Sequence, residues 1–311
     1  MLITLNRNIV RAAIMLVVLA AGLATLAPTA RATPTVGVGD NGPAMFQDPN
    51  FQALGTRISR KIIPYDFHKS EFELDHLRQW LAGAEALGIE PLIALQRSNE
   101  RPNKLPSVGE FRYSISYLRR NFPRVRSISP WNEANHHSQP TARNPRRAAQ
   151  YYGVVRELCR GCKIVAADVL DQKNMLPWLA SFKRYAGGSA RIWGLHSYVD
   201  TNNRITWKQS STRRLLAAVK GQVWMTEVGG LVAFKNKYKY SERRAASAVS
   251  KTLKLARKSS RIRRVYLYSW YGSDHGKSRR NYRWDSGLVG PSGKPRAGFR
   301  VLRDWIDVYG A

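Results

Sequence analysis

The sequence predicts an α/β fold, a single (β/α)8 TIM barrel, on the basis of three observations. Eight short apolar runs follow one another along the chain, and most of the intervals between them carry a helical pattern. The runs are nearly continuous in hydrophobicity, as in parallel strands that are covered on both faces. No Pro-, Gly- or Ser-rich linker divides the chain. Strands that alternate with helices form right-handed βαβ units, and eight such units in one domain indicate a closed barrel.

The predicted strands, in order, are residues 35–39, 58–63, 91–95, 125–129, 163–167, 192–195, 223–225 and 265–268. Helix-start signals lie between several of them. Ser70 and Ser107 each precede a glutamate by three residues, as in a capping box, and Ser241 precedes the helical stretch 242–258. Asn144 is a candidate cap ahead of Pro145. A doubly wound open sheet is the alternative, but the glycine-rich segment 37–42 opens no clear helix, so the barrel is favoured.

Residues 1–32 have the pattern of a secretory signal peptide. Arg7 and Arg11 precede an apolar run over residues 12–27, and Ala30 and Ala32 are small residues at a plausible cleavage point. The run is shorter than the roughly 18 residues expected of a membrane-spanning helix, although an uncleaved anchor is the alternative. Residues 33–311 then form the mature domain, which we expect to be secreted, with no integral membrane segment.

The formal net charge is +30, and it falls to +27 without Arg7, Arg11 and Arg31 of the predicted signal peptide. Such an excess attracts polyanions, which include nucleic acid, anionic lipid and acidic polysaccharide. A solvated basic surface with no such partner is the alternative. The sequence contains no nucleic-acid recognition motif, so we expect no specific binding of nucleic acid. We also expect a monomer.

Cys159 and Cys162 are the only cysteines. A thioredoxin-like pair would open a helix after a strand, whereas this pair closes a predicted helix just before one. Two cysteines cannot provide a structural zinc site by themselves. In an exported chain, the spacing predicts a local disulfide.

The active site of a (β/α)8 barrel lies at the carboxyl ends of the strands, so the polar or aromatic residues that end each run are informative. The candidates from successive strands are Asp40, Arg60, Gln96, Trp131, Asn132, Glu133, Asp168, His196, Tyr198, Glu227 and Trp270. Aromatic rings, amides and acids together suit a sugar, and two glutamates across the mouth suit cleavage of a glycosidic bond. Trp131, Asp168, His196 and Trp270 could each be structural instead.

Three motifs resemble clan A of the glycoside hydrolases, a group of (β/α)8 enzymes. They are WNEAN at residues 131–135, WMTEVG at 224–229, and WDSGLV at 284–289 followed by GKPRA at 293–297. The resemblance implies that Glu133 is the acid/base, that Glu227 is the nucleophile, and that Asn132 donates to the sugar 2-hydroxyl. No metal or cofactor is expected.

The resemblance also assigns neighbours to this pair. It makes His196 and Tyr198 the residues that hold Glu227 or the substrate, and Trp270 the platform under the sugar. Clan members usually end the second strand on an arginine near the nucleophile, and Arg60 is the candidate here, although it precedes the apolar end of its strand. We further expect an apolar wall to keep Glu133 protonated, and His136 and His137 to be solvated.

The leading hypothesis is therefore a secreted retaining glycoside hydrolase that cleaves a polysaccharide or oligosaccharide by double displacement. The substrate is a carbohydrate, and an acidic glycan is one candidate because of the basic charge. A non-catalytic carbohydrate-binding barrel is the alternative, since a fold does not guarantee activity. A nucleic-acid binder is a third hypothesis, which rests on charge alone.

Overall fold

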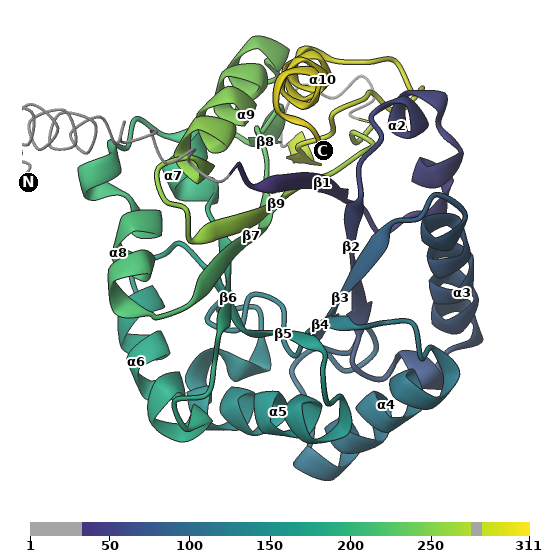
Figure 1. The fold of residues 1–311 in the computed structure, drawn as a ribbon, viewed down its shortest axis with the longest axis vertical. Coiled ribbons are helices and arrows are strands. Elements are labelled where there is room, and N and C mark those ends of the chain that lie inside the picture. The colour runs from purple at the N-terminus through teal and green to yellow at the C-terminus, as the bar shows by residue number, and fades with distance from the viewer. Residues whose placement is uncertain (1–32, 275–281) are drawn as a thin grey trace, which may run out of the picture. The chain divides into compact units, whose positions relative to one another are not determined.

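The computed structural model describes residues 33–274 and 282–311, and Thr33–Ala311 form one compact unit. The predicted signal peptide, residues 1–32, lies outside the described residues. Eight strands close into an all-parallel barrel in the order β1-β2-β3-β4-β5-β6-β7-β9, and Figure 1 shows this ring with the helices around it. The prediction of a single (β/α)8 TIM barrel is confirmed.

The barrel strands are β1 (Thr35–Gly39), β2 (Ile58–Pro64), β3 (Glu90–Gln96), β4 (Ser127–Ser129), β5 (Lys163–Leu170), β6 (Ile192–His196), β7 (Gln222–Val228) and β9 (Ile262–Tyr268). Each overlaps its predicted run. β4 is shorter than the predicted run 125–129. Arg119 Nη1 donates to the backbone oxygen of Val125 at 2.6 Å, and pairing with β3 starts at Ser127, opposite Leu92.

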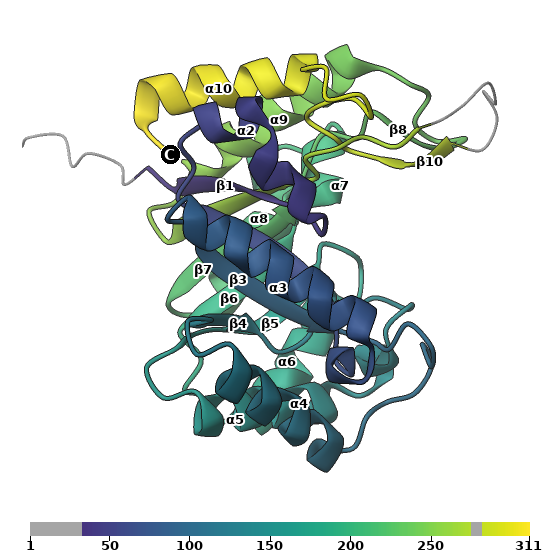
Figure 2. The ribbon, with the colours of Figure 1, turned by 90° about the vertical axis from the view of Figure 1, so that its right-hand side faces the viewer.

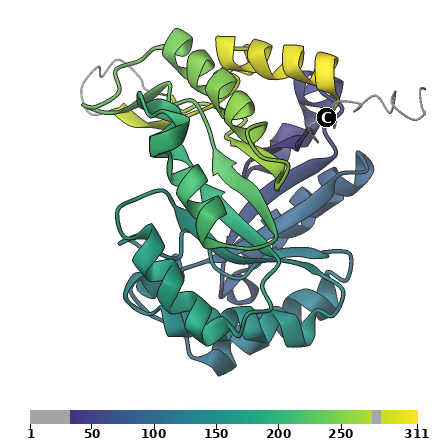
Figure 3. The same ribbon diagram turned by 60° about the vertical axis from the view of Figure 1, so that its left-hand side comes forward.

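Seven longer helices cover the barrel: α3 (Glu71–Ala86), α4 (Val108–Asn121), α5 (Pro145–Leu158), α6 (Met175–Ala186), α8 (Ser211–Ala218), α9 (Glu242–Ala256) and α10 (Ala297–Tyr309). Figure 3 shows the green helices α8 and α9 outside the strands on one side of the barrel. Ser70, Ser107 and Ser241 cap α3, α4 and α9 as predicted. Asn144 stands at the N-cap of α5 but makes no side-chain capping bond, so that expectation was wrong.

Shorter elements connect the units: η1 (Pro43–Gln47), α2 (Pro49–Ala53), η2 (Phe67–Lys69), η3 (Pro140–Arg143), α7 (Tyr198–Asn202) and η4 (Trp207–Gln209). Two further strands, β8 (Ala233–Lys235) and β10 (Tyr282–Asp285), pair in an antiparallel sheet that the sequence did not predict. β8 follows β7 directly and β10 follows β9, so this sheet stands beyond the carboxyl ends of the barrel strands (Figure 2).

The amino-terminal end of the barrel is closed by its own core. Buried side chains from five strands pack together there: Ile58, Leu92, Val165, Trp224 and Tyr266. Arg264 lies 4.1 Å from the centre of the Trp224 ring and makes two 2.9 Å hydrogen bonds to Glu90. A ligand can therefore approach the barrel interior only from the carboxyl end.

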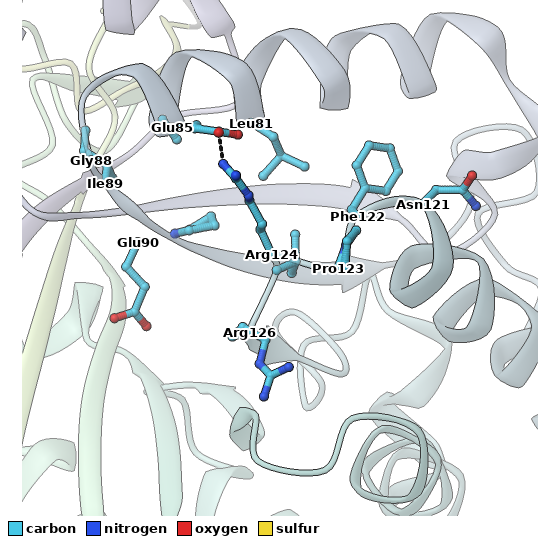
Figure 4. Close-up of a pocket in the computed structure, with 13 residues that line it drawn as sticks. Leu81, Glu85, Gly88, Ile89, Glu90, Asn121, Phe122, Pro123, Arg124 and Arg126 are labelled. Carbon is cyan, nitrogen blue, oxygen red and sulfur yellow. Dashed lines mark ion pairs between the residues drawn. The ribbon is translucent and has the colours of Figure 1, made fainter.

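A hollow of about 560 Å³ also lies at the closed end (Figure 4). It is lined by Leu81 and Glu85 of α3 and by the segment from Asn121 to Arg126, and an ion pair joins Arg124 to Glu85. The candidate site residues Glu133 and Glu227 lie at the other end of the strands. No helix in residues 33–274 or 282–311 is long and apolar enough to cross a membrane.

Cys159 and Cys162 are joined by a disulfide between the end of α5 and the start of β5. The loop that it closes is very short, so the loop-closure model gives a stabilisation of only about 2 kcal/mol. We expect the double variant Cys159→Ser/Cys162→Ser to fold, with a free energy of unfolding lower by about that amount in urea titrations. Two alkylatable thiols in the unfolded, unreduced wild-type protein would contradict the disulfide.

Candidate active site

The two candidate catalytic glutamates reach the barrel mouth from opposite strands. Glu227 is the penultimate residue of β7, opposite His196 of β6. Glu133 follows β4 in a turn, and its φ of 45° is in the left-handed region that non-glycine residues rarely adopt. Such backbone persists where the surroundings enforce it, and it is frequent at functional sites.

Backbone hydrogen bonds on both sides fix this turn. The N–H of Asn132 donates to Leu95 of β3 at 2.6 Å, and the N–H of Ala134 donates to Asp168 of β5 at 2.9 Å. The side chain of Glu133 is thereby directed at the mouth. One carboxylate oxygen of Glu133 and one of Glu227 lie within 4.8 Å of each other.

Arg60 joins the strands beneath these carboxylates. It lies on β2 and is 1% exposed. Its Nη1 donates to Glu227 Oε2 at 2.7 Å, and its Nη2 donates to Asn132 Oδ1 at 2.6 Å and to Asp168 Oδ2 at 3.1 Å. The guanidinium thus positions the predicted nucleophile and the amide beside it. Arg60, the candidate from the second strand, therefore contacts the predicted nucleophile directly.

His196 lies between two carboxylates at the end of β6. Its Nδ1 is 3.2 Å from Glu133 Oε1, and its Nε2 is 3.3 Å from Asp168 Oδ1. Burial lowers the pKa of His196, but the charges of Asp168 and Glu227 and the hydrogen bonds that the ring donates to Asp168 and Glu133 outweigh it and raise the pKa to about 10. The raised pKa favours the imidazolium, in which Nδ1 donates to Glu133 and Nε2 to Asp168; Arg60 Nη2 also lies 3.3 Å from Nε2.

Asp168 forms the floor of the site and does not reach its surface. It is fully buried, and four side chains donate to its oxygens: Arg60, Ser129, Thr226 and His196. Burial raises the pKa of Asp168, but His196 and Arg60 outweigh it and hold the pKa well below its usual range. A Cβ at Gly194 would lie 2.1 Å from Asp168 Oδ1, so only glycine leaves room for this carboxylate. Asp168 is a positioning residue.

The expectation that Glu133 is kept protonated was wrong. Burial does raise the pKa of Glu133, but the hydrogen bond and charge of His196, with smaller contributions from His136 and Arg60, lower the pKa overall. Burial has the largest single effect, but the lowering contributions together exceed it, and the main one comes from His196, 63 residues away in the chain. In the unliganded site, Glu133 is a carboxylate paired with an imidazolium.

We therefore expect His196→Asn to raise the pKa of Glu133, because the imidazolium is lost while the burial remains. If protonated Glu133 is the acid, the alkaline limb of kcat/KM against pH moves to higher pH for a glycoside with a poor leaving group. His137→Asn is the matched control, since His137 lies in the same loop as Glu133 and is exposed. Equal shifts in both variants, or none in His196→Asn, would contradict the assignment.

Tyr198 and Trp284 form one wall of the site. Tyr198 Oη donates to Glu227 Oε1 at 3.0 Å, and burial raises the pKa of Tyr198 so that the phenol stays neutral. The Trp284 ring of β10 meets the Tyr198 ring edge-on at 4.7 Å. Trp284 was part of a motif in the sequence but was given no role, because nothing in the sequence predicted the β8–β10 sheet.

Trp270 does not lie in the site. Its ring is fully buried against Phe51 and Phe299, and its Nε1 donates to Asp48 Oδ2 at 2.9 Å. Tyr268 is the aromatic residue that ends β9 beside the carboxylates. Burial and the charges of Glu227 and Asp40 raise the pKa of its phenol. The expectation that Trp270 is the platform under the sugar is therefore wrong, and Tyr268, at the end of the apolar run, was not among the candidates.

Three other candidates hold the scaffold together. Trp131 is 2% exposed, stacks on Tyr151 of α5 at 5.2 Å, and donates to Gln139. Asp40 accepts backbone N–H bonds from Gly42, Trp270 and Tyr271, which ties the end of β1 to the segment after β9. Gln96 is half-buried at the end of β3, where its backbone oxygen accepts from Tyr65.

The two histidines after Glu133 differ. His137 is exposed, as expected. His136 is half-buried, with Nδ1 2.8 Å from Ser138 Oγ and 3.7 Å from Glu133 Oε2. His136 therefore contributes to the environment of Glu133.

Among the described residues, Glu133, His196 and Glu227 are the group whose spacing could hold a metal ion. Their chemistry opposes it. Both nitrogens of His196 carry protons, and Arg60 already donates to Glu227. A cation would have to displace two positive charges, whereas hydroxyl groups could enter without doing so. That the site holds no metal and no cofactor therefore stays a prediction.

Solved structures that are similar to this chain include glycoside hydrolases. A GH5_18 enzyme of Streptomyces cattleya in complex with Manβ1-4GlcNAc is 15% identical, with a TM-score of 0.64 over 89% of this chain and 81% of that one. A monomeric β-xylosidase of Caulobacter crescentus is 15% identical, with a TM-score of 0.61 over 87% and 67%. The chain has the clan A barrel fold.

A GH10 endoxylanase from a sugarcane soil metagenome gives the same result, with 13% identity and a TM-score of 0.63 over 88% of this chain and 97% of that one. No protein-family model and no curated protein matches the sequence. At such low identity the similarity shows the clan A barrel fold alone.

Proposed function

We propose that the protein is a secreted retaining glycoside hydrolase that cleaves a β-linked polysaccharide or oligosaccharide. The observation that carries the proposal is the pair of glutamates, whose nearest carboxylate oxygens lie within 4.8 Å across the barrel mouth. Retaining enzymes hold such a pair about 5–5.5 Å apart, whereas inverting enzymes leave about 6.5–9.5 Å for a water molecule. The spacing supports double displacement.

Glu227 is the nucleophile in this proposal. Arg60 and Tyr198 donate to its two oxygens, which holds the carboxylate in one orientation. It attacks the anomeric carbon and forms a glycosyl-enzyme ester, while the leaving oxygen takes a proton from Glu133. Asn132, whose Oδ1 is held by Arg60, is positioned beside the sugar 2-hydroxyl.

Glu133 then acts as the base that activates water to hydrolyse the ester. Since His196 lowers the pKa of Glu133 in the free enzyme, the protonated form needed in the first step is favoured at acid pH. The β-linkage is supported by similar structures that include a β-xylosidase, an endoxylanase and a complex with Manβ1-4GlcNAc.

A non-catalytic carbohydrate-binding barrel is the second candidate. It requires the aromatic wall but not the paired glutamates or the buried network of Arg60, Asp168 and His196. Maintaining two buried carboxylates and an imidazolium costs desolvation energy, which favours a catalytic role for them. Export and a monomeric state belong to the proposal, and sequencing the amino terminus of secreted protein tests the former.

The experiment that tests the proposal is a product analysis on a broad panel of polysaccharides and aryl glycosides, with NMR of the first-formed sugar. Hydrolysis with retained anomeric configuration is expected. A first-formed sugar of inverted configuration would exclude double displacement. Binding without hydrolysis of any glycan would favour the non-catalytic barrel.

A further inference from the structure

The charges of the molecule are distributed unevenly along the chain. Residues 158–241 contain 14 lysines and arginines and four acids, and these acids, Asp168, Asp171, Asp200 and Glu227, are all buried. The surface formed by this stretch therefore has no exposed carboxylate. The α3 side differs, because Glu71, Asp75, Glu85 and Glu100 are exposed there.

One part of this basic stretch stands next to the candidate active site. The basic arm, as we define it, consists of Lys235, Lys237 and Lys239 around the turn after β8, with Arg283 on the paired strand β10. All four side chains are exposed. The β8–β10 sheet projects beyond the barrel, as Figure 2 shows.

Aromatic contacts link the basic arm to the nucleophile. Tyr198, which donates to Glu227, meets the ring of Trp284, and Trp284 meets the ring of Phe234 at 5.0 Å. The ammonium group of Lys235 lies 5.2 Å from the Phe234 ring. A glycan chain that leaves the cleavage point along these rings therefore reaches the lysines.

The turn that carries the lysines is built into the fold. Phe234 and Tyr238 exchange two backbone hydrogen bonds, of 2.8 and 3.0 Å, that close the turn. Tyr238 Oη donates to Asn203 at 3.3 Å, and the ammonium group of Lys237 lies 5.2 Å from the Tyr238 ring. These contacts therefore hold the turn that carries the basic side chains in place.

The cations of the turn have no carboxylate partner within residues 33–274 and 282–311. None of the ion pairs there includes Lys235, Lys237 or Lys239. The acids nearest along the chain are engaged, since Glu242 accepts from Tyr240 and Ala297, and Asp285 pairs with Arg296. Aromatic rings that can stack on sugars therefore lie beside ammonium groups that have no carboxylate partner among the described residues.

We propose that the basic arm binds carboxylate groups of an acidic polysaccharide next to the cleavage point, so that the substrate is an anionic glycan. That the bound glycan is also the substrate rests on the proposed function, whereas the binding itself does not depend on hydrolysis. Exposed ion pairs contribute about 0.2–1 kcal/mol each and are screened by salt. Several such ion pairs are therefore needed before the protein binds a charged glycan clearly more tightly than a neutral one.

The test compares two soluble β-glucans, carboxymethylcellulose with carboxylates and hydroxyethylcellulose without them. Binding is measured on the mature chain with Glu227→Ala, so that neither polymer is cut. The arm variant adds Lys235→Gln, Lys237→Gln and Lys239→Gln. The control variant adds Lys220→Gln, Lys258→Gln and Arg263→Gln, which removes the same charge from exposed positions by the closed end of the barrel.

We expect the parent protein to bind carboxymethylcellulose more tightly than hydroxyethylcellulose. The arm variant should weaken carboxymethylcellulose binding about tenfold, and the control variant less than about twofold. The preference should disappear at about 1 M salt, where the Debye length is about 3 Å.

Equal weakening by both variants, or no preference in the parent protein, would overturn the proposal. Tighter binding of mixed-sequence double-stranded DNA that only the arm variant loses would assign the basic arm to nucleic acid and overturn it as well. A glycan panel without any hydrolysis would reject the proposed function but leave the binding result standing. Hydrolysis without a carboxylate preference would reject the inference alone.

Discussion

Replacing Glu133 with glutamine is expected to lower turnover of natural glycosides by about 10²–10⁴-fold, the usual contribution of general acid catalysis. Glutamine keeps the shape of the side chain, and its carbonyl oxygen can still accept from His196 Nδ1, which lies 3.2 Å from Glu133 Oε1. What is lost is the proton for the leaving oxygen. Substrates with a good leaving group need little protonation, so they should keep most of their rate of glycosyl-enzyme formation.

The measurement is kcat/KM for a matched pair of glycosides, one with an acidic phenol and one with an alcohol as leaving group. Glu157→Gln is the control, since Glu157 of α5 lies in an exposed ion pair with Arg112 of α4, outside the barrel. That variant should leave both substrates unaffected. An equal loss on both substrates for Glu133→Gln would assign Glu133 a role other than that of the acid.

Much of the fold could be predicted because it depends on local patterns. Continuous apolar runs and serine caps are properties of short segments, and they located all eight barrel strands and three helix starts. The β8–β10 sheet could not be predicted, because its strands are short and lie 47 positions apart at Lys235 and Tyr282. Short strands of this kind have too few residues to show a period.

The site could be predicted where a side chain lies within a strand and less well where it follows one. Arg60, His196 and Glu227 belong to β2, β6 and β7, so the barrel geometry itself brings them together. Trp270 follows the end of β9, where no strand pattern fixes its direction, and its ring turns into the core. Tyr268, the last residue of β9, faces the carboxylates instead.

The ionisation of Glu133 was the feature least accessible to sequence. Its apolar neighbours along the chain are visible in the sequence and suggest a raised pKa. The deciding group is His196, which is an imidazolium only because Asp168 and Glu227 surround it. Asp168 fits there because residue 194 is glycine. The protonation state of Glu133 therefore depends on contacts among residues from several strands, and no single segment of the sequence contains that information.

Replacing Glu227 with alanine is expected to abolish turnover, on the scale of the roughly 10⁶-fold loss that follows removal of a covalent nucleophile. The variant should still fold, because Asp168 remains as a partner for the Arg60 guanidinium. Thermal unfolding of the variant checks this point. The lost carboxylate leaves a space beside Arg60 Nη1 and Tyr198 Oη, which donated to it at 2.7 and 3.0 Å.

That space can accept a small anion, since a cation and a phenol donor already face it. Added azide should therefore restore cleavage of an activated glycoside by Glu227→Ala and give a glycosyl azide of inverted configuration, because only one displacement occurs. Glu227→Gln is the matched control: it also lacks a nucleophile, but its amide fills the space, so azide should not restore activity. Rescue of both variants, or an azide product of retained configuration, would show that azide does not replace Glu227 and that the nucleophile lies elsewhere.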